Sequence, residues 1–209
     1  MQLIAPGVFA FTGLMMGRVY ALESADGLTL IDAGIGPAAG KVLKQLRAAG
    51  HQSSAVKRIL ITHAHADHIG GLAELQRATG AQVMAHVLEH AALKRSLSSA
   101  RTLSSLRELQ ADVILPEVLN GLQVIFTPGH TAGSVCFWQP EQRVLFCGDV
   151  LLHLWGVSLP LPFVTRDMAA NKRAVKKLAE LDVHSLCFGH GEPLLHDTSA
   201  QLRAFVAKL

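Results

Sequence analysis

The sequence predicts an α/β fold in which β-sheets pack together and helices cover their outer faces. Short apolar runs of strand length dominate both halves of the chain, amphipathic helical segments close each half, and no linker or low-complexity stretch interrupts the 209 residues. Sheets covered by helices bury the apolar faces of both element types most economically. A chain of this length accommodates one well-formed core, so we expect a single domain over residues 1–209.

The first half opens with strands and then alternates strands with helices. Apolar runs between glycine- or aspartate-containing turns predict strands at Val8–Phe11, Val19–Leu22 and Leu28–Ile31. Apolar residues at helical spacing predict a helix over Ala38–Ala49, with Gly50 as its stop. The same patterns predict a strand at Val56–Ile61, a helix at Leu72–Ala78 and a strand at Gln82–Met84.

The second half is expected to begin with a helical region and then return to strands. The segment from Val87 to about Leu109 is rich in Ala, Leu, Ser and Arg, which favours a helix with a break around Ser96–Ser99. Strands are expected at Val124–Phe126, Val135–Trp138, Val144–Cys147 and Ser185–Phe188. The amphipathic pattern of Met168–Leu181 predicts a helix, and Ser199–Leu209 predicts a terminal one.

Composition and charge exclude several classes of protein. The net charge is +3 and the basic residues are scattered, so a nucleic-acid partner is not indicated. No stretch reaches the roughly 18 apolar residues of a membrane span, so no membrane association is expected. The first residues lack the pattern of a secretory signal, and the three cysteines form no CxxC pair. These features predict a cytoplasmic protein with free thiols.

The strongest chemical signal lies between Thr62 and Gly71. Three imidazoles and one carboxylate fall there within six positions, between the apolar run Ile59–Ile61 and a Gly-Gly turn. Buried histidine and aspartate are costly without partners, so such a cluster usually coordinates an ion. Imidazole with carboxylate suits zinc, iron or manganese better than calcium or magnesium. The four side chains are His63, His65, Asp67 and His68.

Three further candidate ligands lie at the ends of downstream strands. His130, Asp149 and His190 each stand beside glycine, just after or before an apolar run. Glycine permits close approach of the backbone, and strand ends can direct side chains into a shared cleft. Each of these residues alone is weak evidence, but the ordered set after HxHxDH is a strong signal for an open metal site.

This ordered set resembles that of the metallo-β-lactamase superfamily, from Leu30–Gly34 to the last glycine-flanked histidine. The resemblance implies a four-layer αββα sandwich with the metal site at one edge of the two sheets. It assigns a first metal ion to His63, His65 and His130, and a second to Asp67, His68 and His190, with Asp149 bridging the two ions. It also implies that Asp32 orients a ligand histidine.

The chemistry that the resemblance implies is hydrolysis. Two divalent ions about 3.5–4 Å apart, zinc above all and otherwise manganese or iron, hold a bridging hydroxide and polarise the carbonyl that it attacks. Asp67 and Asp149 are the expected catalytic residues, and Asp67 orients the nucleophile or transfers its proton to the leaving group. The expected bond is that of an ester, a lactone or a thioester.

The fold serves many activities, so the substrate stays open. Asp149 departs from the β-lactamases that use cysteine at this position. The segment after Asp149 lacks the Cys-Gly-Arg of glyoxalase II, which also carries an added helical domain. The same missing segment counts against a persulfide dioxygenase with one iron, and the scattered basic charge gives little support to a nuclease. The compact branch with lactonase- and esterase-like enzymes fits best.

Several other residues have alternative interpretations. The apolar segment Val150–Val164 is either a pocket wall that suits a small molecule with an acyl or aryl part, or core or a homodimer contact. The family's lactonases usually offer a tyrosine to the substrate, and the only tyrosine here is Tyr20, near the start of the chain. His153 is more often satisfied by backbone than active in a pocket. His86 and His90 are expected on a solvated helix face, and the remaining histidines, His51, His184 and His196, at the surface.

Overall fold

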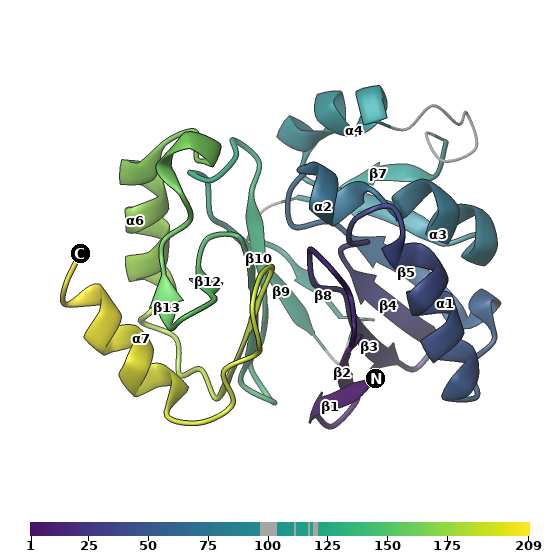
Figure 1. Ribbon diagram of the computed structural model, residues 1–209, viewed down its shortest axis with the longest axis horizontal. Coiled ribbons are helices and arrows are strands. Elements are labelled where there is room, and N and C mark those ends of the chain that lie inside the picture. Colours follow the sequence, from purple (N-terminus) through teal and green to yellow (C-terminus); the bar gives the residue numbers. More distant parts are fainter. Residues whose placement is uncertain (97–103, 111, 117, 119–120) are drawn as a thin grey trace.

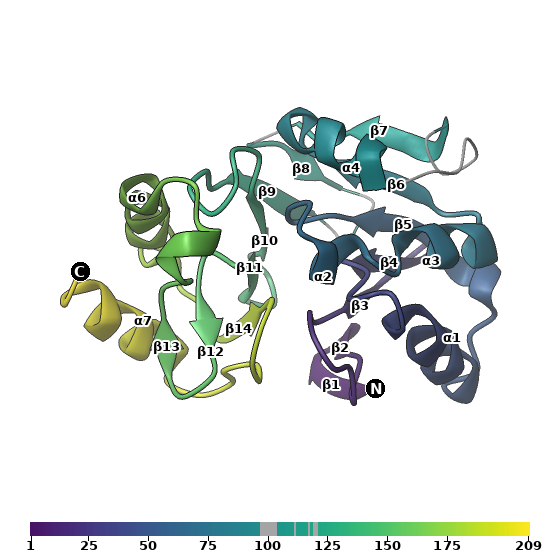
Figure 2. The same cartoon turned by 45° about the horizontal axis from the view of Figure 1, so that its top comes forward.

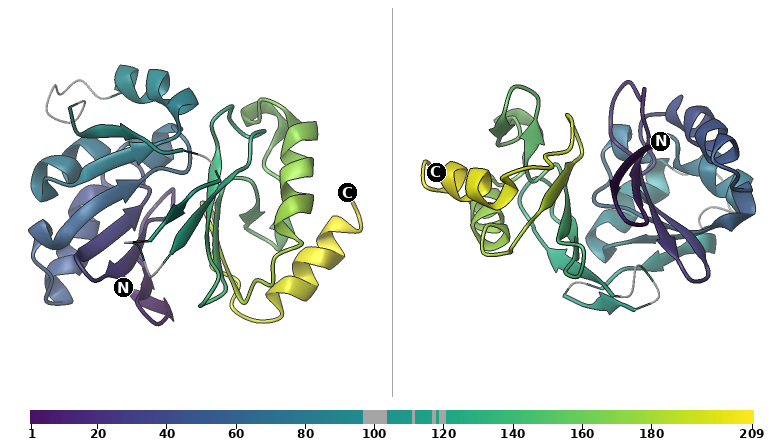
Figure 3. Two further views of the ribbon diagram at one scale, coloured as in Figure 1. Left: turned by 180° about the vertical axis from the view of Figure 1, so that it is seen from behind. Right: turned by 90° about the horizontal axis from the view of Figure 1, so that it is seen from below.

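In the computed structural model, which describes residues 1–96, 104–110, 112–116, 118 and 121–209, two β-sheets lie face to face (Figure 1). Helices cover the outer face of each sheet, as the view from behind in Figure 3 shows. The order of layers is helix, sheet, sheet, helix, which is the predicted αββα sandwich. The fold class is therefore confirmed.

The first sheet contains seven strands in the order β1-β2-β3-β4-β5-β6-β7. They are β1 (Gln2–Ala5), β2 (Val8–Ala10), β3 (Tyr20–Ser24), β4 (Gly27–Ile31), β5 (Val56–Leu60), β6 (Gln82–Ala85) and β7 (Leu106–Glu108). The strands from β1 to β4 are antiparallel, whereas the pairs from β4 to β7 are parallel. Parallel neighbours need crossover connections. The connecting segments contain α1 (Ala38–Ala48), η1 (Ser53–Ala55), α2 (Ala66–Ile69), α3 (Leu72–Thr79), η2 (Val87–Glu89) and α4 (His90–Ser96).

The second sheet has the order β14-β11-β10-β9-β8. Its strands are β8 (Ile114–Leu115), β9 (Leu122–Phe126), β10 (Val135–Gln139), β11 (Val144–Gly148) and β14 (Ser185–Phe188). A small separate pair follows β11 in the sequence, and its members are β12 (Leu152–His153) and β13 (Val157–Ser158). The chain continues through η3 (Pro162–Val164) and α6 (Met168–Leu178), and it ends with α7 (Thr198–Val206).

Alternation along the strands divides the apolar residues among three layers of core. Leu30 packs beneath the helices of the first half, whereas its neighbour Ile31 packs between the two sheets. In the second sheet Phe137 faces the other sheet, whereas its neighbours Cys136 and Trp138 face α6 and α7. Because successive side chains of a strand point to opposite faces, a strand buried on both faces reads as a continuous apolar run.

Most predicted elements are present, with ends shifted by one to three residues. The expected helix from Val87 to about Leu109 is wrong in its second part, because Leu106–Glu108 forms β7. This segment pairs with β6 in parallel and extends the first sheet, a long-range contact that local composition does not encode. Of the expected break at Ser96–Ser99, residues 97–99 lie outside the described residues. Among the described helices, none is long and apolar enough to cross a membrane.

Candidate metal centre

The loops at the carboxyl ends of several strands meet at one edge of the sandwich. Asp32 follows β4, the run from His63 to His68 follows β5, and Asp149 follows β11. His130 and His190 stand in the loops after β9 and β14. Figure 2 shows α2 at this edge, with the β12–β13 pair on the other side. Residues far apart in the sequence therefore come together because their strands end at the same edge.

The structure brings all seven residues of the predicted ligand set together. Their ligand atoms form three overlapping groups, and within each group these atoms lie within 4.8 Å of one another. The groups are His63, His65 and His130; His63, His68 and Asp149; and Asp67, His68 and His190. His63 and His68 each belong to two groups, so the three groups form one continuous cluster.

Asp149 stands at the centre of this cluster. Its Oδ1 lies 3.2 Å from Nε2 of His68, and its Oδ2 lies 3.2 Å from Nε2 of His190 and 3.6 Å from Nε2 of His130. Nε2 of His63 lies 4.0 Å from the same Oδ2. One carboxylate therefore faces imidazoles of both outer groups. Gly189 makes this possible, because a Cβ there would lie 2.1 Å from Asp149 Oδ1.

Three imidazoles are oriented so that their Nε2 atoms face the cluster. Nδ1 of His68 donates to Oδ2 of Asp32 at 2.7 Å. The Thr62 hydroxyl donates to the same Asp32 carboxylate, so its oxygen is left to accept from Nδ1 of His63 at 3.1 Å. The Thr165 hydroxyl donates to the Leu161 carbonyl and lies 3.3 Å from Nδ1 of His130. Such partners fix the ring orientation of a metal-binding histidine and direct its Nε2 atom toward the ion.

The cluster fits divalent cations. Among the buried polar atoms without a hydrogen-bond partner are Nε2 of His63, Nε2 of His68 and Oδ1 of Asp149. All three atoms belong to one ligand group and face the same space. A buried polar atom without a partner costs about 1–3 kcal/mol, and coordination of a cation by these lone pairs removes that cost. Nitrogen and carboxylate donors in this proportion are those of zinc and related metals.

Asp32 contacts a histidine of the cluster, as the supporting role that the resemblance implies would require. Its Oδ1 accepts the backbone N–H of Thr62 at 2.8 Å, and its Oδ2 accepts from His68 and from the Thr62 hydroxyl. Asp32 adopts a left-handed backbone conformation with φ of 59°, which is uncommon for a residue with a side chain. Three hydrogen bonds to one carboxylate hold it in this conformation.

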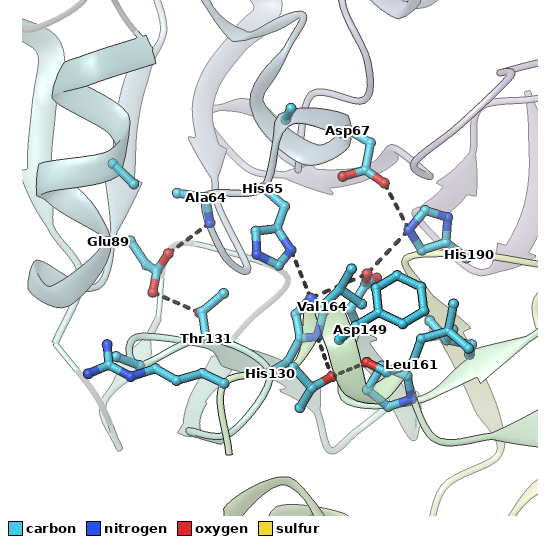
Figure 4. A pocket seen from close by; sticks show the side chains of 18 of the residues that line it. Ala64, His65, Asp67, Glu89, His130, Thr131, Asp149, Leu161, Val164 and His190 are labelled. Atoms are coloured by element: carbon cyan, nitrogen blue, oxygen red, sulfur yellow. Dashed lines mark hydrogen bonds and ion pairs between the residues drawn. The ribbon is translucent and has the colours of Figure 1, made fainter. Parts of the chain in front are cut away.

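Glu89 also shapes the site, and the sequence analysis missed it. This buried residue accepts the backbone N–H of Ala64 at Oε2, at 2.9 Å. Its Oε1 accepts the backbone N–H of Gly133 at 2.7 Å and the hydroxyl of Thr131 at 2.8 Å. Figure 4 shows this carboxylate between the loop of His65 and the loop of His130. Glu89 therefore ties together two loops that supply ligands of the first group.

The protonation states of the cluster fall into two sets. Burial lowers the pKa of His63 well below its usual value, lowers that of His65, and lowers that of His130 to about 4, so these imidazoles are neutral at pH 7. Hydrogen bonds to Asp149 and Asp67 raise the pKa of His190 to about 9. Burial raises the pKa of the Asp149 carboxyl, but the positive charge of His68 and the hydrogen bond from His190 outweigh it and hold this pKa well below its usual range. Neutral imidazole and ionised carboxylate are the forms that bind a metal.

A pocket of about 1060 Å³ opens above the cluster. One wall comes from η2 and α4, and the other from the segment between β11 and α6. Of the predicted apolar segment Val150–Val164, the residues that line this pocket are Leu152, Leu154, Pro160, Leu161, Phe163 and Val164. Val150 and Leu151 belong to the core, and Trp155 is 99% exposed. The segment therefore divides between core and pocket wall, with Leu161 and Val164 visible beside His130 and Asp149 in Figure 4.

The other singled-out residues stand outside the cluster. Nδ1 of His153 lies 2.7 Å from the Glu192 carbonyl, so backbone satisfies this histidine as expected. His90 contacts the Ala85 carbonyl, and His86 stacks on Phe126 at 4.8 Å between ring centroids. Tyr20 is buried and donates to the Phe188 carbonyl, so it does not line the pocket. His184 and His196 are exposed, whereas His51 is half-buried.

Comparisons with known proteins agree with this fold. The family model of the metallo-beta-lactamase superfamily matches residues 12–190. The chain is 27% identical to the probable metallo-hydrolase YflN of Bacillus subtilis, over 91% of this chain and 86% of YflN. It is 36% identical to a hydroxyacylglutathione hydrolase of Rhodopseudomonas palustris, over 72% of this chain and 54% of that protein. The match thus spans only about half the length of the hydroxyacylglutathione hydrolases.

Solved structures show the same fold. A metallo-beta-lactamase family protein of Thermus thermophilus superposes with a TM-score of 0.77 and 24% identity, over 99% of this chain and 80% of that one. The metallo-beta-lactamase SMB-1 superposes with a TM-score of 0.75 and 22% identity, over 98% and 92% of the two chains. The fold and the site are those of a metallo-hydrolase. The chain belongs to the metallo-β-lactamase superfamily.

Proposed function

We propose that this protein is a hydrolase that uses two divalent metal ions, zinc in the native enzyme, to cleave the carbonyl bond of an ester, a lactone or a thioester. One observation carries the proposal: three ligand groups overlap, with Asp149 in the middle one, and the buried atoms Nε2 of His63, Nε2 of His68 and Oδ1 of Asp149 make no hydrogen bond. The overlap of the groups at His63 and His68 supports two ions rather than one.

The residues divide between two ions in this proposal. His63, His65 and His130 would hold the first ion, and Asp67, His68 and His190 the second, with Asp149 bridging them. Bound divalent cations lower the pKa of water and polarise the carbonyl under attack. The chain does not then need a serine or cysteine nucleophile, and its three cysteines are free and buried away from the site.

Asp67 and its neighbours would manage the proton. The Asp67 side chain is 19% exposed at the pocket and lies 3.0 Å from Nε2 of His190. The hydrogen bond from His190 lowers the pKa of the Asp67 carboxyl, so this group is an acceptor at neutral pH. We assign Asp67 Oδ1 or Oδ2 to accept the proton of the attacking water and to return it to the leaving group.

The substrate would be a small molecule with an apolar acyl or aryl part. Its apolar part would lie on Leu154, Leu161 and Phe163, which expose 55%, 54% and 82% of their surface beside the cluster. Large exposed apolar side chains at a pocket mark a binding site more often than an ordinary surface. The relatives named hydroxyacylglutathione hydrolase favour a thioester among the three bonds. The absence of the Cys-Gly-Arg segment after Asp149 favours a different leaving group from glutathione.

We extend the proposal to the domain organisation, cellular location and oligomeric state of the enzyme. Both sheets share a core between them, which supports one domain over residues 1–209. The three cysteines are unpaired, which supports the cytoplasm as its location. Trp155 is exposed but does not line the pocket. We therefore include a homodimer contact at this residue in the proposal.

A panel of substrates tests the proposal. The zinc-loaded protein is incubated with a lactone, an aryl ester, a glutathione thioester and a β-lactam, and one of the first three is expected to turn over. Asp149→Asn keeps the shape of the side chain but removes its charge, and it is expected to abolish hydrolysis. Glu180→Gln, which changes an exposed carboxylate in the turn after α6, serves as the matched control with full activity. Full activity of Asp149→Asn would overturn the bridging assignment. An inactive panel with one bound iron per chain would point to the oxidoreductase alternative.

A further inference from the structure

Each wall of the pocket contributes one arginine that the proposed hydrolysis does not use. Arg95 comes from the last turn of α4 in the first half of the chain. Arg166 comes from the loop between η3 and α6 in the second half. Both residues are exposed and both line the same pocket as the cluster. The two cations therefore face one space from opposite walls.

The sequence of the first wall places Arg95 on the pocket side of its helix. Ala91, Ala92 and Arg95 of α4 line the pocket, and residues three and four apart share one face of an α-helix. Leu88 of η2 lines the pocket just before them. The two alanines are small and leave room in the pocket. Along this wall the lining therefore changes from the apolar Leu88, through the two alanines, to the positively charged Arg95.

The backbone of Arg166 is fixed next to the ligand loop of His130. Its N–H donates to the His130 carbonyl at 3.1 Å, and the N–H of Asp167 donates to the Gly129 carbonyl at 2.9 Å. The Asp167 side chain then caps α6 by accepting the N–H of Ala170 at 2.9 Å. The start of the Arg166 side chain is therefore held by structure on both sides, and only its charged end is free to move.

Neither arginine is paired within the described part of the chain. Other arginines of this protein form ion pairs, as Arg18 does with Glu192 and Arg143 with Asp182. For Arg95 and Arg166, no side-chain hydrogen bond or ion pair with a described residue exists. The acids of the pocket are already engaged: Glu89 accepts three donors, and Asp67 and Asp149 face the histidines.

We propose that the substrate carries an anionic group, a carboxylate or a phosphate, which Arg95 and Arg166 bind while its apolar part lies against Leu161 and Phe163. This inference rests on the proposed function and narrows it to amphipathic anionic esters or thioesters. The guanidinium group presents a planar fork of donors that matches both kinds of anion. An apolar wall beside two unpaired cations suits a molecule that has an apolar part and an anionic group.

Binding of hydrolysis-resistant probes tests the inference without turnover. The probes are N-butylglutaramate, which ends in a carboxylate, its neutral counterpart N-butylpentanamide, and the corresponding phosphonate. Each is titrated by calorimetry into the metal-loaded protein and into Arg95→Gln, Arg166→Gln and the control Arg203→Gln. Arg203 is an exposed arginine on α7, remote from the pocket lining. The carboxylate and phosphonate probes together show which anion is preferred.

The expected result is that an anionic probe binds at least about tenfold more tightly than the neutral one, a difference of about 1.4 kcal/mol. Each pocket variant should lose most of this preference, the control should keep it, and added salt should weaken it. Equal binding of charged and neutral probes would overturn the inference, as would an anionic preference that survives both variants and thus comes from the metals alone. The ester panel is read separately, so an active enzyme with neutral preference refutes only this inference.

Discussion

Glu89 offers the sharpest structural test of how the first ligand group is held. In Glu89→Gln the side chain keeps its shape but has one acceptor oxygen instead of two. If the amide oxygen serves Gly133 and Thr131, the amide nitrogen faces the N–H of Ala64, and two donors oppose each other. An unsatisfied buried donor costs about 1–3 kcal/mol, and the two remaining bonds lose their charge assistance. Since Ala64 is only half-buried, we expect a total loss of about 2–3 kcal/mol.

Thermal unfolding and metal titration together measure this effect. For a chain of this size, 1 kcal/mol corresponds to about 2–4 °C, so the melting temperature of the metal-free variant should fall by about 5–10 °C. Because Glu89 joins the loops of His65 and His130, the affinity for one of two ions should also fall about tenfold. The affinity for the ion assigned to Asp67, His68 and His190 should stay unchanged. Glu74→Gln, an exposed acid on α3, is the matched control.

The reasoning fails if Glu89→Gln has the same melting temperature and the same affinity for both ions as the unmodified protein. It also fails if both ions are weakened equally, because the hydrogen bonds of Glu89 go to Ala64, between His63 and His65, and to Thr131 and Gly133, next to His130.

The site supports three further predictions. Asp32→Asn leaves His68 without its carboxylate partner, so the affinity for the second ion should fall about 10–100-fold; an unchanged affinity in metal titration would contradict the orienting role. His190 has a pKa of about 9, and although burial lowers the pKa of His68, the charges of Asp149 and Asp32 raise it well above its usual value. Both imidazoles are therefore protonated at pH 7 and must release a proton to bind cations, so metal affinity should rise with pH. Calorimetry in buffers of different ionisation enthalpy counts these protons, and their absence would refute the assignment. Phe163→Ala removes an 82% exposed side chain, so stability should change by less than about 0.5 kcal/mol, whereas KM should rise along a series of acyl chain lengths. A flat series would remove Phe163 from the pocket.

The ligands of this site could be predicted because their signal is local. His63, His65 and His68 stand within six positions after an apolar strand, and the desolvation cost of such residues implies a partner. The signal at His130, Asp149 and His190 is weaker for each residue alone. It gains weight because all three stand beside glycine at the end of a strand-like run, one after another along the chain. The fold class followed for a related reason, since strands buried on both faces read as short continuous apolar runs.

Features that depend on distant partners could not be predicted. Glu89 follows Val87 and Leu88 in what reads as an ordinary helix start, and its three partners lie 25, 42 and 44 residues away. Strand β7 was not predicted for the same reason, because Leu106–Glu108 forms a strand through its pairing with β6. In both cases tertiary contacts, rather than local preference, decide the structure.

The central claim of this account is that the cluster around Asp149 holds two metal ions. Elemental analysis of the purified protein, read against protein concentration, tests it most directly. We expect about two zinc ions per chain, falling to about one in Asp149→Asn because the bridging ligand is lost. A single iron per chain, unchanged in that variant, would contradict both the dinuclear site and the hydrolytic function.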